Sequence, residues 1–70
     1  MQIQVNGQSL QTRAQNVAQL LEELDFVAPA GAPVGIAVAV NGSVVRRALH
    51  AQFSLGEGDQ IEIIRAVQGG

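Results

Sequence analysis

The 70-residue chain contains no cysteine, and this absence removes several kinds of site at once. Without thiols the chain cannot form a disulfide, a thiolate nucleophile or a cysteine-based zinc or iron-sulfur site. Its single histidine, His50, cannot by itself supply a histidine metal site. A small domain without such staples must depend on well-packed apolar side chains for its stability.

Lysine is also missing, and aromatic residues are scarce. Four arginines face six acidic residues, which gives a formal net charge of -2, and two phenylalanines are the only aromatic residues. Nucleic-acid binding depends on a positive field and often on aromatic stacking, so we expect no nucleic-acid partner. A P-loop needs a lysine, so nucleotide binding by this chain alone is disfavoured.

Long hydrophobic runs are absent as well. The longest apolar run, Ile36 to Val40, is far too short to span a bilayer, and the N-terminus has no charged leader. We therefore expect a cytoplasmic protein with no membrane partner. The composition of 47% hydrophobic and 14% charged residues is too apolar for a disordered chain. A chain of this length builds at most one small core, with little room for a substrate cavity.

The most informative local signal present is the dipeptide Asn-Gly, which occurs twice. Asn6-Gly7 and Asn41-Gly42 each separate two segments of strand character, and both residues of such a turn tolerate positive φ. This pattern predicts one hairpin over residues 1–12 and a second over residues 34–45. A cluster of turn residues at 56–59 then leads into a further strand, predicted over residues 60–67.

Between the hairpins the hydrophobic period changes to that of a helix. Apolar residues recur at helical spacing from Val17 to Leu24, and Asn16 with Gln19 forms a capping-box pattern. We predict a helix over residues 17–25 and a proline-containing loop over residues 28–33. The order predicts an α+β roll, a mixed sheet of about four to five strands packed on one short helix. The predicted core is Ile3, Val5, Leu10, Val17, Leu20, Leu21, Leu24, Ile36, Val38, Leu55, Ile61 and Ile63.

Catalytic residues are hard to find in this chain. His50 could serve as a general base, but no cysteine accompanies it and the serines occupy turn-like contexts, so we predict a turn or edge histidine. Glu22, Glu23 and Asp25 lie opposite the leucine stripe, and we interpret them as a solvated helix face rather than paired catalytic carboxylates. Leu49 and Phe53 are predicted to anchor an irregular segment.

A docking site is predicted near the end of the last strand. If Ile61 and Ile63 face the helix, Ile64 lies on the opposite face of the sheet, where an exposed apolar residue can mark an interface. The alternative is that the segment around Phe53 covers it. Three arginines, which either pair with a partner or anchor their own fold, are also candidate docking residues: Arg46, Arg47 and Arg65.

The sequence ends in Gly69-Gly70, directly after the predicted last strand. We expect a globular domain over residues 1–67 and a flexible tail over residues 68–70. Two residues without a Cβ can thread a narrow channel, and a carboxylate there suits a substrate better than a catalyst. Acyl chemistry on a carboxylate requires an activated form such as an acyl-adenylate, made in another protein. Because four residues reach only about 13 Å, the domain must dock beside that active site.

These features together resemble the ThiS sulfur carrier family, within the ubiquitin-like β-grasp group. The likeness covers nearly the whole chain. Two departures are Arg46-Arg47 where many relatives have Pro-Arg, and a missing aromatic residue near His50. The matching segments are Ile3 to Gly7, Val17 to Leu24, Ala39 to Gly42, Val44 to Arg46, Gly58 to Ile64, and Val67 with Gly69-Gly70.

The resemblance implies a carrier modified by other enzymes, not an enzyme. A ThiF-like enzyme would adenylate the Gly70 carboxylate with ATP and Mg, and the carboxylate would then become a thiocarboxylate. A cysteine desulfurase would supply the sulfur, and a ThiG-like thiazole synthase would accept it for thiamine biosynthesis. Gln68 and Gly69 would be recognised as part of the tail, and the chain itself would bind no cofactor.

Two other functions remain open on the sequence. A MoaD-like carrier, which delivers sulfur to molybdopterin, shares the fold and the Gly-Gly ending. A β-grasp protein-interaction module, in which the two glycines are incidental, is the alternative from a different class. Detection of a thiocarboxylate on protein made in cells would distinguish a carrier from such a module.

Overall fold

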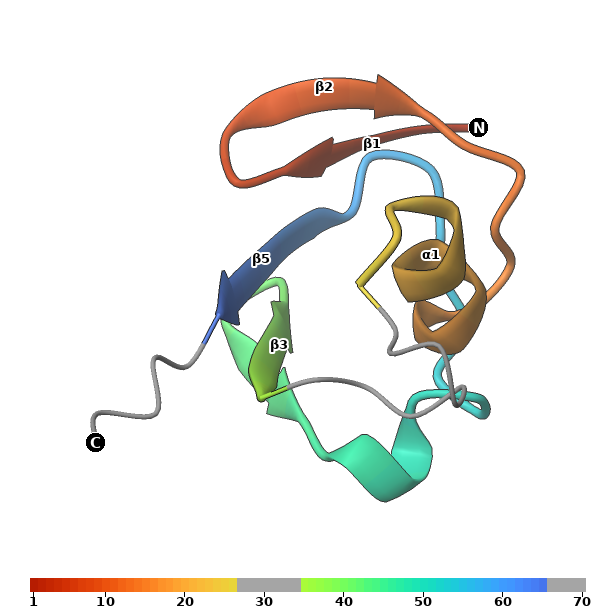
Figure 1. The fold of residues 1–70 in the computed structure, drawn as a ribbon. Coiled ribbons are helices and arrows are strands. Elements are labelled where there is room, and N and C mark those ends of the chain that lie inside the picture. The colour runs from red at the N-terminus through yellow and green to blue at the C-terminus, as the bar shows by residue number, and fades with distance from the viewer. Residues whose placement is uncertain (27–34, 66–70) are drawn as a thin grey trace.

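The computed structural model describes residues 1–26 and 35–65, which form a five-stranded sheet packed on a helix (Figure 1). The strand order is β2-β1-β5-β3-β4; β5 pairs in parallel with β1, and the other neighbours are antiparallel. The α+β roll with a mixed sheet is therefore confirmed. The elements are β1 (Gln2–Val5), β2 (Gln8–Gln11), α1 (Val17–Glu23), β3 (Ile36–Val40), β4 (Ser43–Val45), the 3-10 helix η1 (Arg47–Leu49) and β5 (Gln60–Arg65).

Both Asn-Gly turns form the predicted hairpins. Asn6 and Gly7 have φ of 51° and 82°, and Asn41 and Gly42 have φ of 52° and 85°. Positive φ at both central residues matches the right-handed twist of the flanking strands, which explains why this dipeptide closes two-residue hairpins. The predicted loop over residues 28–33 lies outside the described residues.

Helix α1 begins as predicted and ends two residues earlier than predicted. The Asn16 side chain accepts a hydrogen bond from the Gln19 backbone N–H at 2.8 Å. At the other end, Asp25 has a φ of 63° and donates its N–H to the Glu22 carbonyl, while Phe26 donates to the Leu21 carbonyl at 2.8 Å. This is a Schellman ending with aspartate in the left-handed position that glycine usually occupies, so Asp25 terminates the helix instead of belonging to it.

The core lies between α1 and one face of the sheet, and every predicted core residue is in it or packs against it. Three buried apolar residues were missing from the prediction: Ala14, Val40 and Val45. Leu49 was wrongly predicted as an anchor, because its side chain is 44% exposed. The buried apolar residues are Ile3, Ala14, Val17, Leu20, Leu21, Val38, Val40, Val45, Ile61 and Ile63.

Candidate functional site

The face of the sheet opposite α1 carries an exposed apolar patch. Ile64 is 60% exposed and Val44 is 75% exposed. Ile64 pairs with Ala37, and Val44 pairs with Ala39, and residues directly opposite one another across two strands project to the same face. We call Ile64, Ala37, Ala39 and Val44 the outer patch. The predicted exposure of Ile64 is confirmed.

The segment around Phe53 does not cover Ile64. Phe53 is half-buried and packs against the core, and its carbonyl accepts a hydrogen bond from the Val17 backbone N–H at 3.1 Å. That contact holds the segment at the start of α1, on the inner side of the sheet. Among the described residues the outer patch is therefore left exposed, and exposed apolar residues that lie together can mark an interface.

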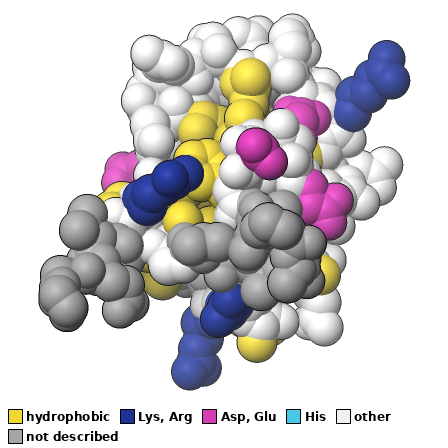
Figure 2. Space-filling view, viewed as in Figure 1, with side chains coloured by type: hydrophobic (Ala, Val, Ile, Leu, Met, Phe, Trp, Pro, Cys, Tyr) yellow, Lys and Arg dark blue, Asp and Glu magenta, His cyan; other side chains and the backbone are white. Residues whose placement is uncertain are grey.

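The three candidate docking arginines gather at one end of the sheet. β4 and β5 both run antiparallel to β3, so Arg46 and Arg47, which follow β4, lie at the same end as Arg65, the last residue of β5. The Arg65 guanidinium carbon lies 5.2 Å from the centre of the Phe26 ring, within cation–π range. On the face shown in Figure 2, several acidic side chains lie over α1, and another lies at the left of the view beside a basic side chain.

His50 lies in a turn, as predicted, and it is also buried, which the sequence did not show. Its side chain is 5% exposed, and its Nε2 lies 3.2 Å from the Val45 carbonyl, to which it donates in the neutral tautomer we assign. Its own carbonyl accepts from the Ala18 N–H at 3.1 Å. The turn that η1 introduces directs His50 inward and Leu49 outward, which the spacing of apolar residues does not reveal. His50 thus joins β4 to α1 and has a structural role.

Glu23 is exposed on the helix face, as predicted, and it also accepts hydrogen bonds that the sequence did not reveal. The buried hydroxyl of Thr12 donates a hydrogen bond to Glu23 Oε2 at 2.7 Å and accepts one from the Ala14 N–H at 3.0 Å. Glu23 therefore fixes the segment that connects β2 to α1. Glu22 and Asp25 are exposed, as predicted.

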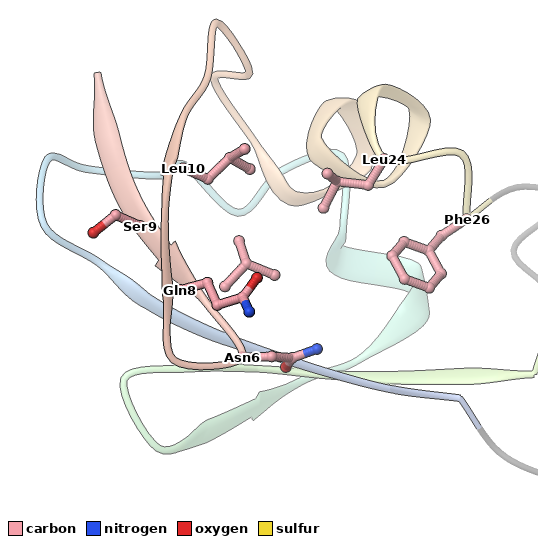
Figure 3. A pocket seen from close by; sticks show the side chains of 7 residues that line it. Asn6, Gln8, Ser9, Leu10, Leu24 and Phe26 are labelled. Carbon is pink, nitrogen blue, oxygen red and sulfur yellow. The ribbon is translucent and has the colours of Figure 1, made fainter.

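A mainly apolar hollow lies between the first hairpin and the end of α1 (Figure 3). Its volume is about 250 Å³, below the roughly 300–1,000 Å³ of most small-molecule sites. Leu10 and Leu24 point into it from opposite sides, and no charged side chain lines it. This hollow offers nothing to hold a phosphate or a nucleotide.

Neither a metal site nor a membrane span is found in residues 1–26 and 35–65. No group of three or more histidine or acidic side chains there could hold a metal ion. No helix of that part is long and apolar enough to cross a bilayer. Gln68, Gly69 and Gly70 lie outside the described residues, so their roles remain predictions.

A sheet with β5 between the parallel β1 and the antiparallel β3, folded over a single described helix, is the β-grasp arrangement of ubiquitin-like proteins. Within that class, residues 3–70 match the ThiS family, and the chain belongs to it. The chain is 39% identical over 71 residues to the sulfur carrier protein ThiS of Escherichia coli, and each covers the other completely.

Two solved structures support the same assignment. The crystal structure of the thiamine biosynthesis protein ThiS from Geobacter metallireducens has a TM-score of 0.79 and 26% identity, with complete coverage of both chains. The solution structure of a thiamine biosynthesis protein from the same organism has a TM-score of 0.75 and 30% identity, covering 100% of this chain and 88% of that one. The ubiquitin-like β-grasp fold inferred from the resemblance is therefore confirmed.

Proposed function

We propose that this protein is a sulfur carrier of thiamine biosynthesis that carries sulfur as a thiocarboxylate on Gly70. The observation that carries the proposal is the match to the ThiS family over residues 3–70, which includes both terminal glycines. The full-length identity to a sulfur carrier protein ThiS supports the same function. The chain is then a co-substrate that other enzymes modify, and it is not itself a catalyst.

The chemistry needs an activated carboxyl group. An oxygen of the Gly70 carboxylate attacks the α-phosphorus of ATP, pyrophosphate leaves, and an acyl-adenylate forms. A persulfide sulfur of a partner then attacks the carbonyl carbon and displaces AMP, which gives an acyl disulfide. A thiol of a partner protein would cleave its S–S bond, so that the thiocarboxylate leaves and the thiol and the donor cysteine form a disulfide. A ThiF-like enzyme would hold the ATP and Mg, a cysteine desulfurase would supply the sulfur, and a ThiG-like synthase would use it to form the thiazole. All of these partners would meet the carrier in the cytoplasm.

Docking would use the outer patch and the arginines beside it. Gly70 is the fifth residue after Arg65, so it can lie at most about 16 Å from the end of β5. The partner must therefore bind the domain close to this end of the sheet. Ile64 would enter an apolar part of the partner, and Arg46, Arg47 and Arg65 would face acidic groups that orient it.

The thiamine role is favoured over a MoaD-like role by the names that the similar proteins carry. Both the relative from Escherichia coli and the crystal structure from Geobacter metallireducens are ThiS proteins. A simple interaction module is disfavoured because the family match continues through Gly70. An increase in mass that corresponds to replacement of one oxygen by sulfur, measured on intact protein from cells, would separate the carrier from the module.

Deletion of Gly70 is the direct test of the proposal. The shortened chain ends about 3.3 Å short of the reacting phosphorus, and a misplacement near 1 Å already costs about a hundredfold in rate. We expect adenylation by the ThiF-like enzyme, followed as ATP-dependent pyrophosphate release, to fall at least that far. The melting temperature should stay within about two degrees, since surface changes usually alter stability by less than about 0.5 kcal/mol. Adenylation of the deletion variant at the wild-type rate would show that Gly70 is not the site.

A further inference from the structure

The two turn asparagines both hold strand β5 through their side-chain amides. Asn41 accepts a hydrogen bond from the Gln60 N–H at 3.0 Å and donates one to Asp59 Oδ1 at 3.1 Å. Asn6 accepts from the Ile63 N–H at 2.9 Å and donates to the Ile63 carbonyl at 3.2 Å. Asn41 thus secures the start of the strand, whereas Asn6 secures its later half.

The Asn6 amide takes the place of a missing strand residue. On the side of β5 that faces β1, the Asp59 carbonyl accepts from the Gln4 N–H and the Ile61 carbonyl accepts from the Asn6 N–H, both at 2.9 Å. Alternate residues of a strand direct their hydrogen-bonding groups to the same side. After Asp59 and Ile61, Ile63 is therefore the next residue of β5 whose N–H and carbonyl face the β1 side. At that point β1 has already turned away, and the Asn6 side chain satisfies both backbone groups of Ile63.

We propose that Asn6 is a positioning residue for the carrier tail, whose amide holds β5 from the β1 side through Ile63 and so sets the direction in which the chain leaves the sheet toward the activating enzyme. This inference rests on the proposed carrier function. Asn6 does not touch the reacting atoms, and it acts only through β5.

Strand β5 pairs with β3 as far as Arg65, so the Asn6 amide does not set the reach of the tail. It determines whether the end of the strand is held from both sides. On the β1 side the last backbone hydrogen bond is at Ile61, and without the Asn6 amide residues 62–65 would be held from the β3 side alone. A strand end held from one side is oriented less firmly, and enzymes depend strongly on the orientation of the reacting group.

The test compares Asn6→Gly with Asn41→Gly. Glycine accepts positive φ, so both variants keep a turn of the same type and lose only the amide. Steady-state adenylation by the ThiF-like enzyme is measured with ATP and each carrier, and amide hydrogen exchange at Ile63 is followed by NMR. We expect Asn6→Gly to lower kcat about tenfold and to leave KM within about twofold, because the outer patch is unchanged.

The matched variant shows whether the effect is more than a loss of stability. Asn41→Gly should keep kcat within about twofold of wild type, although it removes as many side-chain hydrogen bonds as Asn6→Gly. Exchange at the Ile63 amide should accelerate at least about tenfold in Asn6→Gly and stay unchanged in Asn41→Gly. Asn6→Asp keeps the acceptor for the Ile63 N–H but loses the donor, so its kcat should fall between those of Asn6→Gly and wild type.

Each alternative result has a definite meaning. Equal kcat values for Asn6→Gly and Asn41→Gly, an effect on KM alone, or unchanged protection of the Ile63 amide in Asn6→Gly would overturn the positioning role. In those cases adenylation of the wild-type chain would still support the carrier function. If the wild-type chain itself is not adenylated, the carrier function fails, and the positioning role fails with it.

Discussion

Two adjacent isoleucines on β5 have opposite surroundings. Ile63 is 6% exposed and belongs to the core between the sheet and α1, whereas Ile64 is 60% exposed on the outer patch. The residue type and the strand are the same, and only the alternation of side chains along the strand separates them. Stability and association can therefore be altered separately in this protein, by substitutions one position apart.

The inner and outer faces of the sheet also differ in the residues that surround their apolar side chains. On the inner face the first hairpin, α1 and the β3–β4 hairpin all contribute buried side chains. On the outer face alanines on β3 lie beside Ile64 and Val44, the exposed Glu62 pairs with Ala39, and Arg46 follows β4 at one end of the patch. An apolar surface with charges at its margin is typical of protein interfaces that form and dissociate.

The largest effect is expected on the inner face. Ile61→Ala should lower the free energy of unfolding by about 2–5 kcal/mol, because Ile61 is fully buried and its loss leaves a cavity. A domain of this size has only roughly 4–10 kcal/mol in total, so the variant should be close to unfolding. Urea denaturation followed by circular dichroism measures the change. Ile64→Ala is the matched control, and its free energy of unfolding should stay within about 0.5 kcal/mol of wild type. Comparable losses of stability in the two variants would show that the two faces of the sheet do not differ in their contribution to stability.

The next effect is expected on the outer face. Ile64→Asp should weaken binding to the ThiF-like enzyme by about tenfold to a hundredfold, because it places a charge where an apolar contact is expected. Calorimetric titration of the variant against the enzyme measures this change, and urea denaturation should show nearly wild-type stability. Ser43→Asp, an exposed position outside the outer patch, controls for the added charge. Equal affinity for Ile64→Asp and wild type would remove Ile64 from the docking surface.

The smallest effect is expected from a substitution that weakens α1 and leaves both faces of the sheet unchanged. Asn16→Ala removes the side chain that caps the helix, and loss of such a cap typically costs about 1 kcal/mol. Thermal unfolding should show a melting temperature several degrees lower, about 4–8 °C for a domain of this size. Affinity for the activating enzyme should not change at a temperature where the variant is folded. A lower affinity would mean that the outer patch depends on the helix.

Local patterns predicted most of the fold because the decisive signals lie within a few residues. The two Asn-Gly turns, the cap at Asn16 and the alternation around Ile64 each depend on neighbours in the chain. The end of α1 was misplaced because Asp25 adopts a left-handed conformation for which glycine is the usual signal.

The features that the sequence did not predict are contacts between residues far apart in the chain. The pair formed by Thr12 and Glu23, the contact of Arg65 with Phe26 and the hold of Asn6 on Ile63 depend on how whole elements pack. A single sequence contains no local pattern that pairs residue 6 with residue 63. The exposure of Ile64 at the candidate site could be predicted, whereas the surroundings of Arg65 could not. The roles of Gln68, Gly69 and Gly70 stay predictions.

The position of β5 also determines how the protein folds. β1 with β2, and β3 with β4, are local hairpins that can form early and separately, since each closes a loop of only two residues. β5 follows all of them in the chain and is inserted between them, pairing with β1 across more than 50 residues. Such non-local pairing raises the contact order and slows folding. The sheet therefore becomes continuous only when β5 enters it, and the strand that leads to the proposed site at Gly70 is also the one that completes the sheet.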